Sequence, residues 1–325
     1  MAYLLSQNKL VSLPQTYTSR FFGSNKYIFE DGCLIEKKKE CKDDMTLKAF
    51  CDKSRERSKK ILAAIEFINR VEVAEPAERE YKLNVKKVRA RAWALFNTRQ
   101  GQKHMSFNTI SFPIGFSDDD AFKCFNVFLT RCRKKAGLKN YLWVSERQKN
   151  GTIHFHMITT EYMPIKQINS FMAVCLSKYF DAYKGTEAFA RYATKEEFQA
   201  KYNGVDVESV RNCERNKGKL ANYITKYISK ENTITFSRLV WHCSRSVSAL
   251  FTDINITEDE VFEIIEHMNN NGFEAKYLEI NEFVSVFYLN VSNGNDYYHV
   301  PDEYLKDLYI VNTEILDMYA ESQNN

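Results

Sequence analysis

Two histidines separated by one residue are the first candidates for chemistry in this sequence. His154 and His156 flank Phe155 within residues 152–159, a stretch whose composition predicts a β-strand. Residues i and i+2 of a strand project from the same face, so both imidazoles would face one side while Phe155 packs on the other. Neutral imidazoles on a rigid sheet are good ligands for a divalent metal ion. An isolated pair of this kind is more often structural, so a third ligand would strengthen the prediction.

Glu146 is the candidate for that third ligand, and its position depends on a hairpin turn. It lies on the predicted partner strand of the histidine strand. A two-residue loop, Asn150-Gly151, would set Glu146 opposite Phe155, on the wrong face. A three-residue loop, Lys149-Asn150-Gly151 with its glycine in the left-handed position of a bulge, would set Glu146 opposite His154. The alternative is an exposed strand acid, and the residues alone leave both interpretations open.

Two tyrosines four residues apart form a second candidate group. Tyr223 and Tyr227 lie one above the other on a helix predicted for residues 217–230, and Lys226 shares their stripe. A separate apolar stripe would anchor this helix, which leaves the tyrosines free to project beside it. A tyrosine hydroxyl has an unperturbed pKa of about 10, so it attacks phosphate at neutral pH only near a cation. Two helical tyrosines taken alone are usually packing residues.

The elements that must position these groups predict an α+β fold with a sheet domain over about residues 105–250. Ser117 caps a helix with an acidic first turn, a row of phenylalanines and a basic end before Gly137. The predicted order is strand 105–112, the helix after Ser117, the hairpin, a helix from Pro164 to about Phe180, strand 205–210 and helix 217–230.

The flanking regions suggest a three-part organisation. Residues 1–100 are predicted to be a basic, mainly helical N-terminal region, residues 101–252 the sheet domain, and residues 253–325 a small α/β C-terminal segment. Residues 1–40 look irregular, and residues 44–70 have helical periodicity. Residues 81–96 form either a second basic helix or an extended arm. A capping box at Thr257 to Glu260 opens a further helix, and we expect the C-terminal segment to dock against the sheet domain.

Composition limits the class of protein. The 46 basic and 42 acidic side chains give a net charge of +4, but six basic residues and no acid lie between positions 81 and 102. Such a cluster fits either a nucleic-acid contact or a solvated basic helix. The eight cysteines include no C-x-x-C pair, which disfavours a zinc knuckle. No signal peptide and no apolar run of about 18 residues is present, so we expect an intracellular protein with no membrane contact.

The motifs in combination resemble the HUH endonuclease superfamily, and most closely the replication initiators of microvirus-type single-stranded DNA phages. The likeness is carried by an upstream strand, the H-hydrophobe-H pair and Y-x-x-x-Y-x-x-K, in that order. It lies in residues 146–156, 222–230 and 241–246, within a span of roughly 105–250. The resemblance implies a central antiparallel sheet flanked by helices, with the histidines in its middle. It also implies Mg²⁺ or Mn²⁺ bound by His154, His156 and Glu146 to polarise a scissile phosphate.

The resemblance further implies that Tyr223 and Tyr227 stand over the metal. One tyrosine would cut single-stranded DNA at a replication origin, leaving a 5′-phosphotyrosine and a 3′-hydroxyl that primes synthesis. The second would cut after one round, and Lys226 would position the phosphate or stabilise its charge. No G-x-x-x-x-G-K-[ST] loop is present, so a host helicase and polymerase would be partners in the cytoplasm of a bacterial host.

Alternatives remain at this point. A Y2 transposase or plasmid replication protein of the same superfamily would share the chemistry and differ in substrate. A noncatalytic nucleic-acid-binding protein would carry a merely structural H-x-H. A metal-dependent hydrolase that uses water would need neither tyrosine. For DNA contact the candidates are basic side chains at 82–91 and the aromatic rings of Tyr141 and Trp143, although these two rings fit core positions better.

Overall fold

The structure of the protein is a computed structural model that describes part of the chain. The described residues are 2–6, 9–13, 21–30, 32–37, 84–148, 150–211, 239–281, 284–289, 292–293, 296–298 and 300–322. The helices predicted for residues 44–70 and 217–230 lie outside them.

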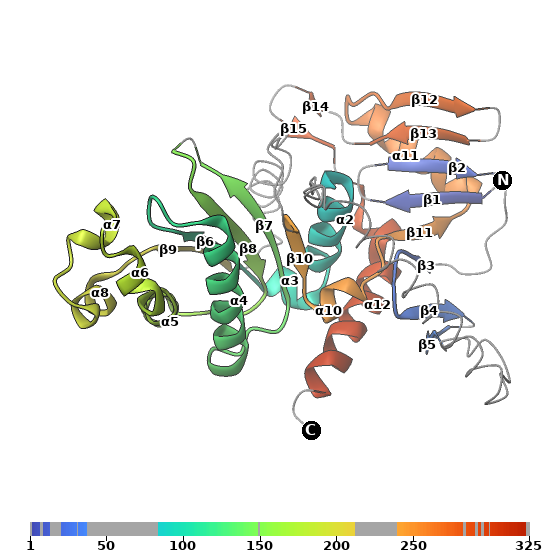
Figure 1. Cartoon of the computed structure of the whole chain (residues 1–325). Coiled ribbons are helices and arrows are strands. Elements are labelled where there is room, and N and C mark those ends of the chain that lie inside the picture. Colours follow the sequence, from blue (N-terminus) through green and yellow to red (C-terminus); the bar gives the residue numbers. More distant parts are fainter. Residues whose placement is uncertain are drawn as a thin grey trace, which may run out of the picture.

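A five-stranded antiparallel sheet lies left of the middle of the molecule in Figure 1. Its strand order is β10 (Trp241–Cys243), β7 (Tyr141–Arg147), β8 (Ile153–Thr159), β6 (His104–Ser111) and β9 (Val205–Arg211). The histidine strand β8 is the middle strand, paired with β7 on one side and β6 on the other. The predicted antiparallel sheet with the histidines at its centre is therefore confirmed.

One face of this sheet is covered by α4 (Asp118–Lys135) and α5 (Ile165–Leu176). The predicted start and end of α4 are confirmed: the Ser117 hydroxyl accepts from the Asp120 backbone N–H, and Gly137 has a φ of +68°. The phenylalanine row of α4 packs on the residue between the two histidines. Phe125 stacks on Phe155 with ring centroids 3.9 Å apart, and Phe155 is fully buried. This aromatic layer holds the middle of β8 in place.

The opposite face packs against α2 (Val85–Phe96), which continues into the short α3 (Arg99–Lys103). Residues 85–96 are thus a helix rather than an extended arm. Its apolar stripe of Val88, Ala92 and Leu95 is completely buried in the same cluster as Val144 and Ile158 of the sheet. The sheet therefore carries the histidines and this apolar cluster on one face, with the polar group nearer the hairpin turn.

A second sheet combines strands from both ends of the chain. Its order is β12 (Lys276–Asn281), β13 (Val284–Tyr288), β2 (Lys9–Leu13), β1 (Ala2–Ser6), β11 (Asp253–Ile256) and β3 (Phe21–Phe22). A separate hairpin, β4 (Tyr27–Glu30) with β5 (Cys33–Glu36), follows. The expectation of irregular structure in residues 1–40 was wrong, because the apolar residues of β1 and β2 find partners in strands far along the sequence.

This pairing also bears on the predicted three-part organisation. The described part of residues 1–100 contains five strands as well as α2 and the start of α3, so it is mixed rather than mainly helical. The boundaries at 100 and 252 stay predictions, although β11, β12 and β13 share their sheet with β1 and β2.

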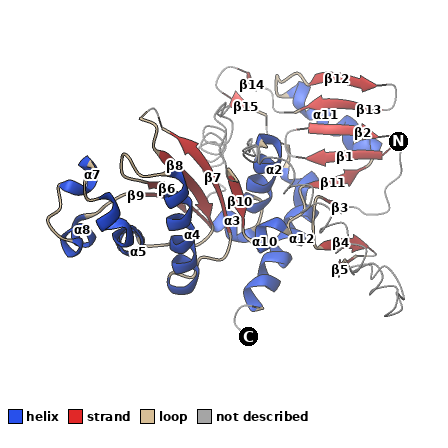
Figure 2. Ribbon diagram, viewed as in Figure 1, coloured by secondary structure: helices blue, strands red, loops and turns tan. Residues whose placement is uncertain are grey.

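Two helices of the C-terminal part complete the arrangement. The capping box of α11 (Glu258–Asn270) is confirmed, with the side chains of Thr257 and Glu260 each bonded to the other's backbone. Helix α12 (Asp302–Glu321) contacts α2, α3 and β11, and in Figure 1 it lies with α2 between the two sheets. Figure 2 separates these helices from the strands by colour. The shorter elements are η1 (Ser177–Tyr179), α6 (Phe180–Tyr183), α7 (Glu187–Ala190), α8 (Lys195–Lys201), α10 (Arg245–Ser248), β14 (Ser292–Asn293) and β15 (Asp296–Tyr297).

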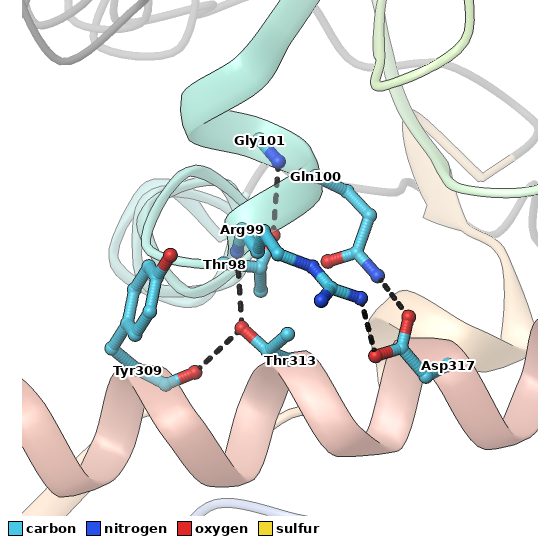
Figure 3. Close-up of polar contacts among 7 residues, drawn as sticks. All are labelled: Thr98, Arg99, Gln100, Gly101, Tyr309, Thr313 and Asp317. Atoms are coloured by element: carbon cyan, nitrogen blue, oxygen red, sulfur yellow. Dashed lines mark hydrogen bonds and ion pairs between the residues drawn. The ribbon is translucent and has the colours of Figure 1, made fainter.

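Helix α12 docks on α3 through a compact polar contact (Figure 3). The Arg99 backbone N–H donates to Thr313 Oγ1 at 3.0 Å. The Asp317 carboxylate accepts from the Arg99 guanidinium at 2.8 Å and from the Gln100 amide at 2.7 Å. Arg99 and Gln100 end the predicted N-terminal region, and α12 also contacts α10 and Phe251 of the predicted sheet domain, so the C-terminal segment docks on both. None of the described helices combines the length and apolarity that a membrane span requires.

Candidate active site

The hairpin turn between β7 and β8 sets the register of the site. The Gln148 N–H donates to the Thr152 carbonyl at 2.9 Å, and the Gly151 N–H donates to the Gln148 carbonyl at 2.9 Å. Gly151 has a φ of +82°, the left-handed conformation that a side chain disfavours. Glu146 consequently pairs with His154. Of the two loops that the residues left open, the structure has the three-residue one, which places Glu146 on the histidine face.

His156 is held at both of its ring nitrogens. Its Nε2 lies 3.0 Å from Glu146 Oε2 on β7, and its Nδ1 lies 3.3 Å from Thr109 Oγ1 on β6. Thr109 is directly opposite His156 in the strand pairing. A hydroxyl donates or accepts, so Thr109 supports either neutral tautomer of the imidazole. Such a partner at Nδ1 fixes the ring orientation and leaves Nε2 directed at the acid.

His154 is oriented by a different residue. Its Nδ1 lies 3.0 Å from the Gln148 side-chain nitrogen, at the start of the turn. A half-turn of the Gln148 amide offers its oxygen to Nδ1–H instead, which frees Nε2 as a lone-pair donor. Burial, followed by the neighbouring His156, lowers the pKa of His154 to about 4. His154 is therefore neutral at neutral pH, which is the state that metal ligation requires.

The three predicted ligands share a face but do not all converge. His156 contacts Glu146, whereas the His154 ring turns to Gln148, with its centroid 6.3 Å from that of His156. Within the described residues no group of three or more His, Cys, Asp or Glu side chains is close enough to hold a metal ion. The donor set itself, two neutral imidazoles and one carboxylate on adjacent strands, fits a divalent ion chemically.

The predicted tyrosine group cannot be placed beside these residues. Tyr223, Tyr227 and Lys226 lie outside the described residues. Their position over the histidines therefore stays a prediction.

The structure tests three of the residues that the sequence offered for DNA contact. Tyr141 and Trp143 are each 6% exposed and belong to the core under α4, so they are not stacking platforms. Arg91 is also buried, and its guanidinium donates to the carbonyls of Leu250 and Gly23, which removes it from the predicted DNA-binding set. A cation that satisfies buried carbonyls at a junction of three segments has a structural role.

The structure adds Thr109 and Gln148 to the site residues predicted from the sequence. Gln148 could be found from the strand register, because pairing Glu146 with His154 puts position 148 at the start of the turn, beside His154. Thr109 could be found only by pairing β6 with β8, which are separated by a long helix.

Comparison with known proteins gives a match that covers this region. Residues 108–232 match the family model of the replication-associated protein ORF2. The match begins within β6, contains the whole histidine hairpin and extends over Tyr223 and Tyr227. It supports a replication-initiator role for the chain. No curated protein and no solved structure matches the chain.

Proposed function

We propose that this protein is a rolling-circle replication initiator that nicks and rejoins single-stranded DNA through a tyrosine. The observation that carries the proposal is the largely buried group of Glu146, His154 and His156 at the middle of the sheet. That group lies inside the stretch matching a replication-associated family, and the same stretch contains both candidate tyrosines. The finer likeness to HUH initiators of microvirus-type phages is part of the proposal.

The proposed reaction is a transesterification. The hydroxyl oxygen of Tyr223 or Tyr227 attacks the scissile phosphorus, the bond from phosphorus to the 3′ oxygen breaks, and the tyrosine proton ends on that oxygen. The products are a 5′-phosphotyrosine and a 3′-hydroxyl. One phosphodiester replaces another, so no nucleoside triphosphate is consumed. Attack by a later 3′-hydroxyl reverses the exchange and rejoins the strand.

Each of the remaining side chains has a proposed task. Glu146, His154 and His156 would hold Mg²⁺ or Mn²⁺, which supplies charge neutralisation at the phosphate when bound. Thr109 and Gln148 would keep the two imidazoles oriented. Lys226 would stabilise the charge that develops on the phosphate oxygens. The sheet supplies rigidity, because β8 is hydrogen-bonded on both edges and packed against Phe125.

A covalent-adduct assay tests the proposal directly. Purified protein is incubated with 5′- or 3′-labelled single-stranded DNA carrying its own origin, with Mn²⁺ or Mg²⁺, and run on a denaturing gel. We expect a band at protein mass only when the label is on the 3′ fragment, whose 5′ phosphate is retained. The band should disappear with EDTA and in the Tyr223→Phe/Tyr227→Phe double variant. A matched control is Tyr162→Phe, an exposed tyrosine beyond the end of β8.

Two outcomes would replace the proposal. Cleavage that leaves no adduct and survives loss of both tyrosines would assign a hydrolase that uses water. Binding without cleavage, on DNA known to contain the origin, would assign a noncatalytic nucleic-acid-binding protein.

A Y2 transposase or plasmid initiator would give the same adduct and differ in the DNA that it cuts. Helicase and polymerase partners and a bacterial cytoplasm belong to the same proposal.

A further inference from the structure

Trp241 lies on the same sheet face as the candidate active site. On β10 it pairs with Val144 of β7, and Val144 in turn pairs with His156 of β8. Residues that pair directly across antiparallel strands project from the same face. Trp241 is partly buried against the core, which fixes its ring, yet part of its surface stays accessible. Leu239, two residues earlier, is 54% exposed.

Positive charge gathers beside this ring. Lys87 Nζ lies 5.9 Å from the centroid of the Trp241 ring, in the range of a cation–π contact. Lys86 and Lys87 are exposed in the first turn of α2, and that turn contains no acidic residue. The amino end of a helix carries partial positive charge that acids usually balance. Here two lysines add to that charge instead, which favours a polyanionic partner over an apolar one.

We propose that Trp241 and Lys87 form a binding subsite for single-stranded DNA next to the active site. An unpaired base stacks on the accessible part of the indole, and Lys87 and Lys86 contact the phosphates on either side of it. An aromatic ring beside a basic groove is the arrangement by which proteins bind single strands without reading sequence. The inference deepens the proposed function and rests on it, because a strand seated here runs along the sheet toward His156.

The other two tryptophans provide internal controls. Trp143 is 6% exposed and belongs to the core on the opposite face. Trp93 packs edge-on against Phe96 within α2 and is half-buried, as Trp241 is, so its own variant is needed as the control. The proposed subsite predicts that base stacking quenches the fluorescence of Trp241, and variants at Trp93 and Trp241 separate the contributions of these two partly buried rings.

The test is a fluorescence titration of the full chain with an unlabelled oligothymidylate in EDTA, so that binding is measured without cleavage. We expect saturable quenching in the wild type that disappears in Trp241→Phe and persists in Trp93→Phe. Anisotropy with a labelled oligonucleotide gives the affinity of the same variants. Trp241→Ala should weaken binding at least about fivefold, and Trp241→Phe, which keeps an aromatic face, much less.

Lysine variants test the charged half of the subsite. Lys87→Ala should weaken binding and lower the slope of log affinity against log salt by about one. The control is Lys166→Ala, an exposed lysine in the first turn of α5 on the opposite face, which should change neither quantity. Because Lys87 is exposed, this variant also keeps the test informative if Trp241→Ala fails to fold.

Failure of this inference is distinguishable from failure of the proposed function. Unchanged quenching in Trp241→Phe, unchanged affinity in Trp241→Ala, or equal quenching by duplex DNA would overturn the subsite. In those cases the wild type would still form the covalent adduct, and the proposed function would stand. A wild type that binds no single-stranded DNA and forms no adduct would overturn both.

Discussion

The side chains around His156 form a chain of contacts across three strands. Thr109 on β6, His156 on β8 and Glu146 on β7 are linked by hydrogen-bond distances of 3.3 and 3.0 Å. The hydroxyl is the part of Thr109 that contacts the ring, and its hydrogen bond to Nδ1 fixes the ring orientation in either tautomer. The contribution of Thr109 to metal binding can therefore be separated from its contribution to the fold.

Replacing Thr109 by Val keeps the branched shape and removes the hydroxyl. We expect Mn²⁺ affinity, measured by calorimetry on the DNA-free protein, to fall about tenfold, as for loss of an outer-sphere partner. Thr109→Ser should retain most of the affinity. Equal Mn²⁺ affinity in wild type and Thr109→Val would mean that this hydroxyl does not orient a metal ligand. No Mn²⁺ binding by the wild type would remove the metal from the proposal.

Phe155, on the opposite face of β8, contributes to the stability of the fold. It is fully buried and stacked on Phe125 between the two histidines in sequence. Phe155→Ala should lower the free energy of unfolding by about 3–5 kcal/mol, the usual cost of emptying a buried aromatic position. Urea denaturation followed by circular dichroism measures it. Phe155→Leu should cost clearly less, and equal costs would show that the position is not tightly packed.

At the scale of elements, the hairpin from β7 to β8 shows what local sequence can predict. The turn residues are adjacent to the strands that they join, so their chemistry decides the register, and the placement of Glu146 was predictable once a three-residue loop was chosen. The contact between Thr109 and His156 was not predictable in this way, because β6 and β8 are joined through α4 and β7. The tyrosine helix was predicted from periodicity alone, and its placement stays untested.

Gly151 gives the turn a direct test. A Cβ added there would meet no atom within 4 Å, but φ is +82°, so the cost of Gly151→Ala is one of backbone conformation alone. We expect a loss of roughly 1 kcal/mol in the free energy of unfolding. Gly185 is the matched control, since it also has open space but no left-handed φ. Gly185→Ala should be neutral or slightly stabilising, and equal effects at both positions would contradict the argument.

At the scale of the whole molecule, a buried amide of α12 ties this helix to the segment that leads into the second sheet. Asn312 is fully buried, and its side chain accepts from the Phe251 N–H at 2.8 Å and donates to the Phe251 carbonyl at 3.0 Å. Phe251 lies just before β11, so this contact ties the helix to the start of the second sheet. The sequence gives no sign of it, because the two residues are 61 positions apart.

Asn312→Ala would leave both backbone groups of Phe251 buried without this partner. Each such group costs about 1–3 kcal/mol, so the variant should be destabilised by at least about 2 kcal/mol. Asn270→Ala, at an exposed position of α11, is the control and should stay within about 0.5 kcal/mol of wild type. Chemical denaturation measures the free energy of unfolding of both variants. Similar midpoints would mean that the fold tolerates loss of the Asn312 hydrogen bonds.

The pairing of β1 with β11 determines the order in which the two sheets can be completed during biosynthesis. Tyr3 pairs with Ile256, so the first strand must wait for about 250 further residues to be made before its sheet can close. At about 5–20 residues per second this delay is roughly 10–50 s on the ribosome. During that time β1 and β2 can pair only with each other, so their outer edges lack the partners β11 and β13 and the apolar side chains of Leu5 and Leu10 stay uncovered, whereas the strands of the histidine sheet from β6 to β9 have already emerged. The nascent chain therefore completes the sheet that carries its candidate chemistry, apart from the edge strand β10, well before the sheet that closes its two ends.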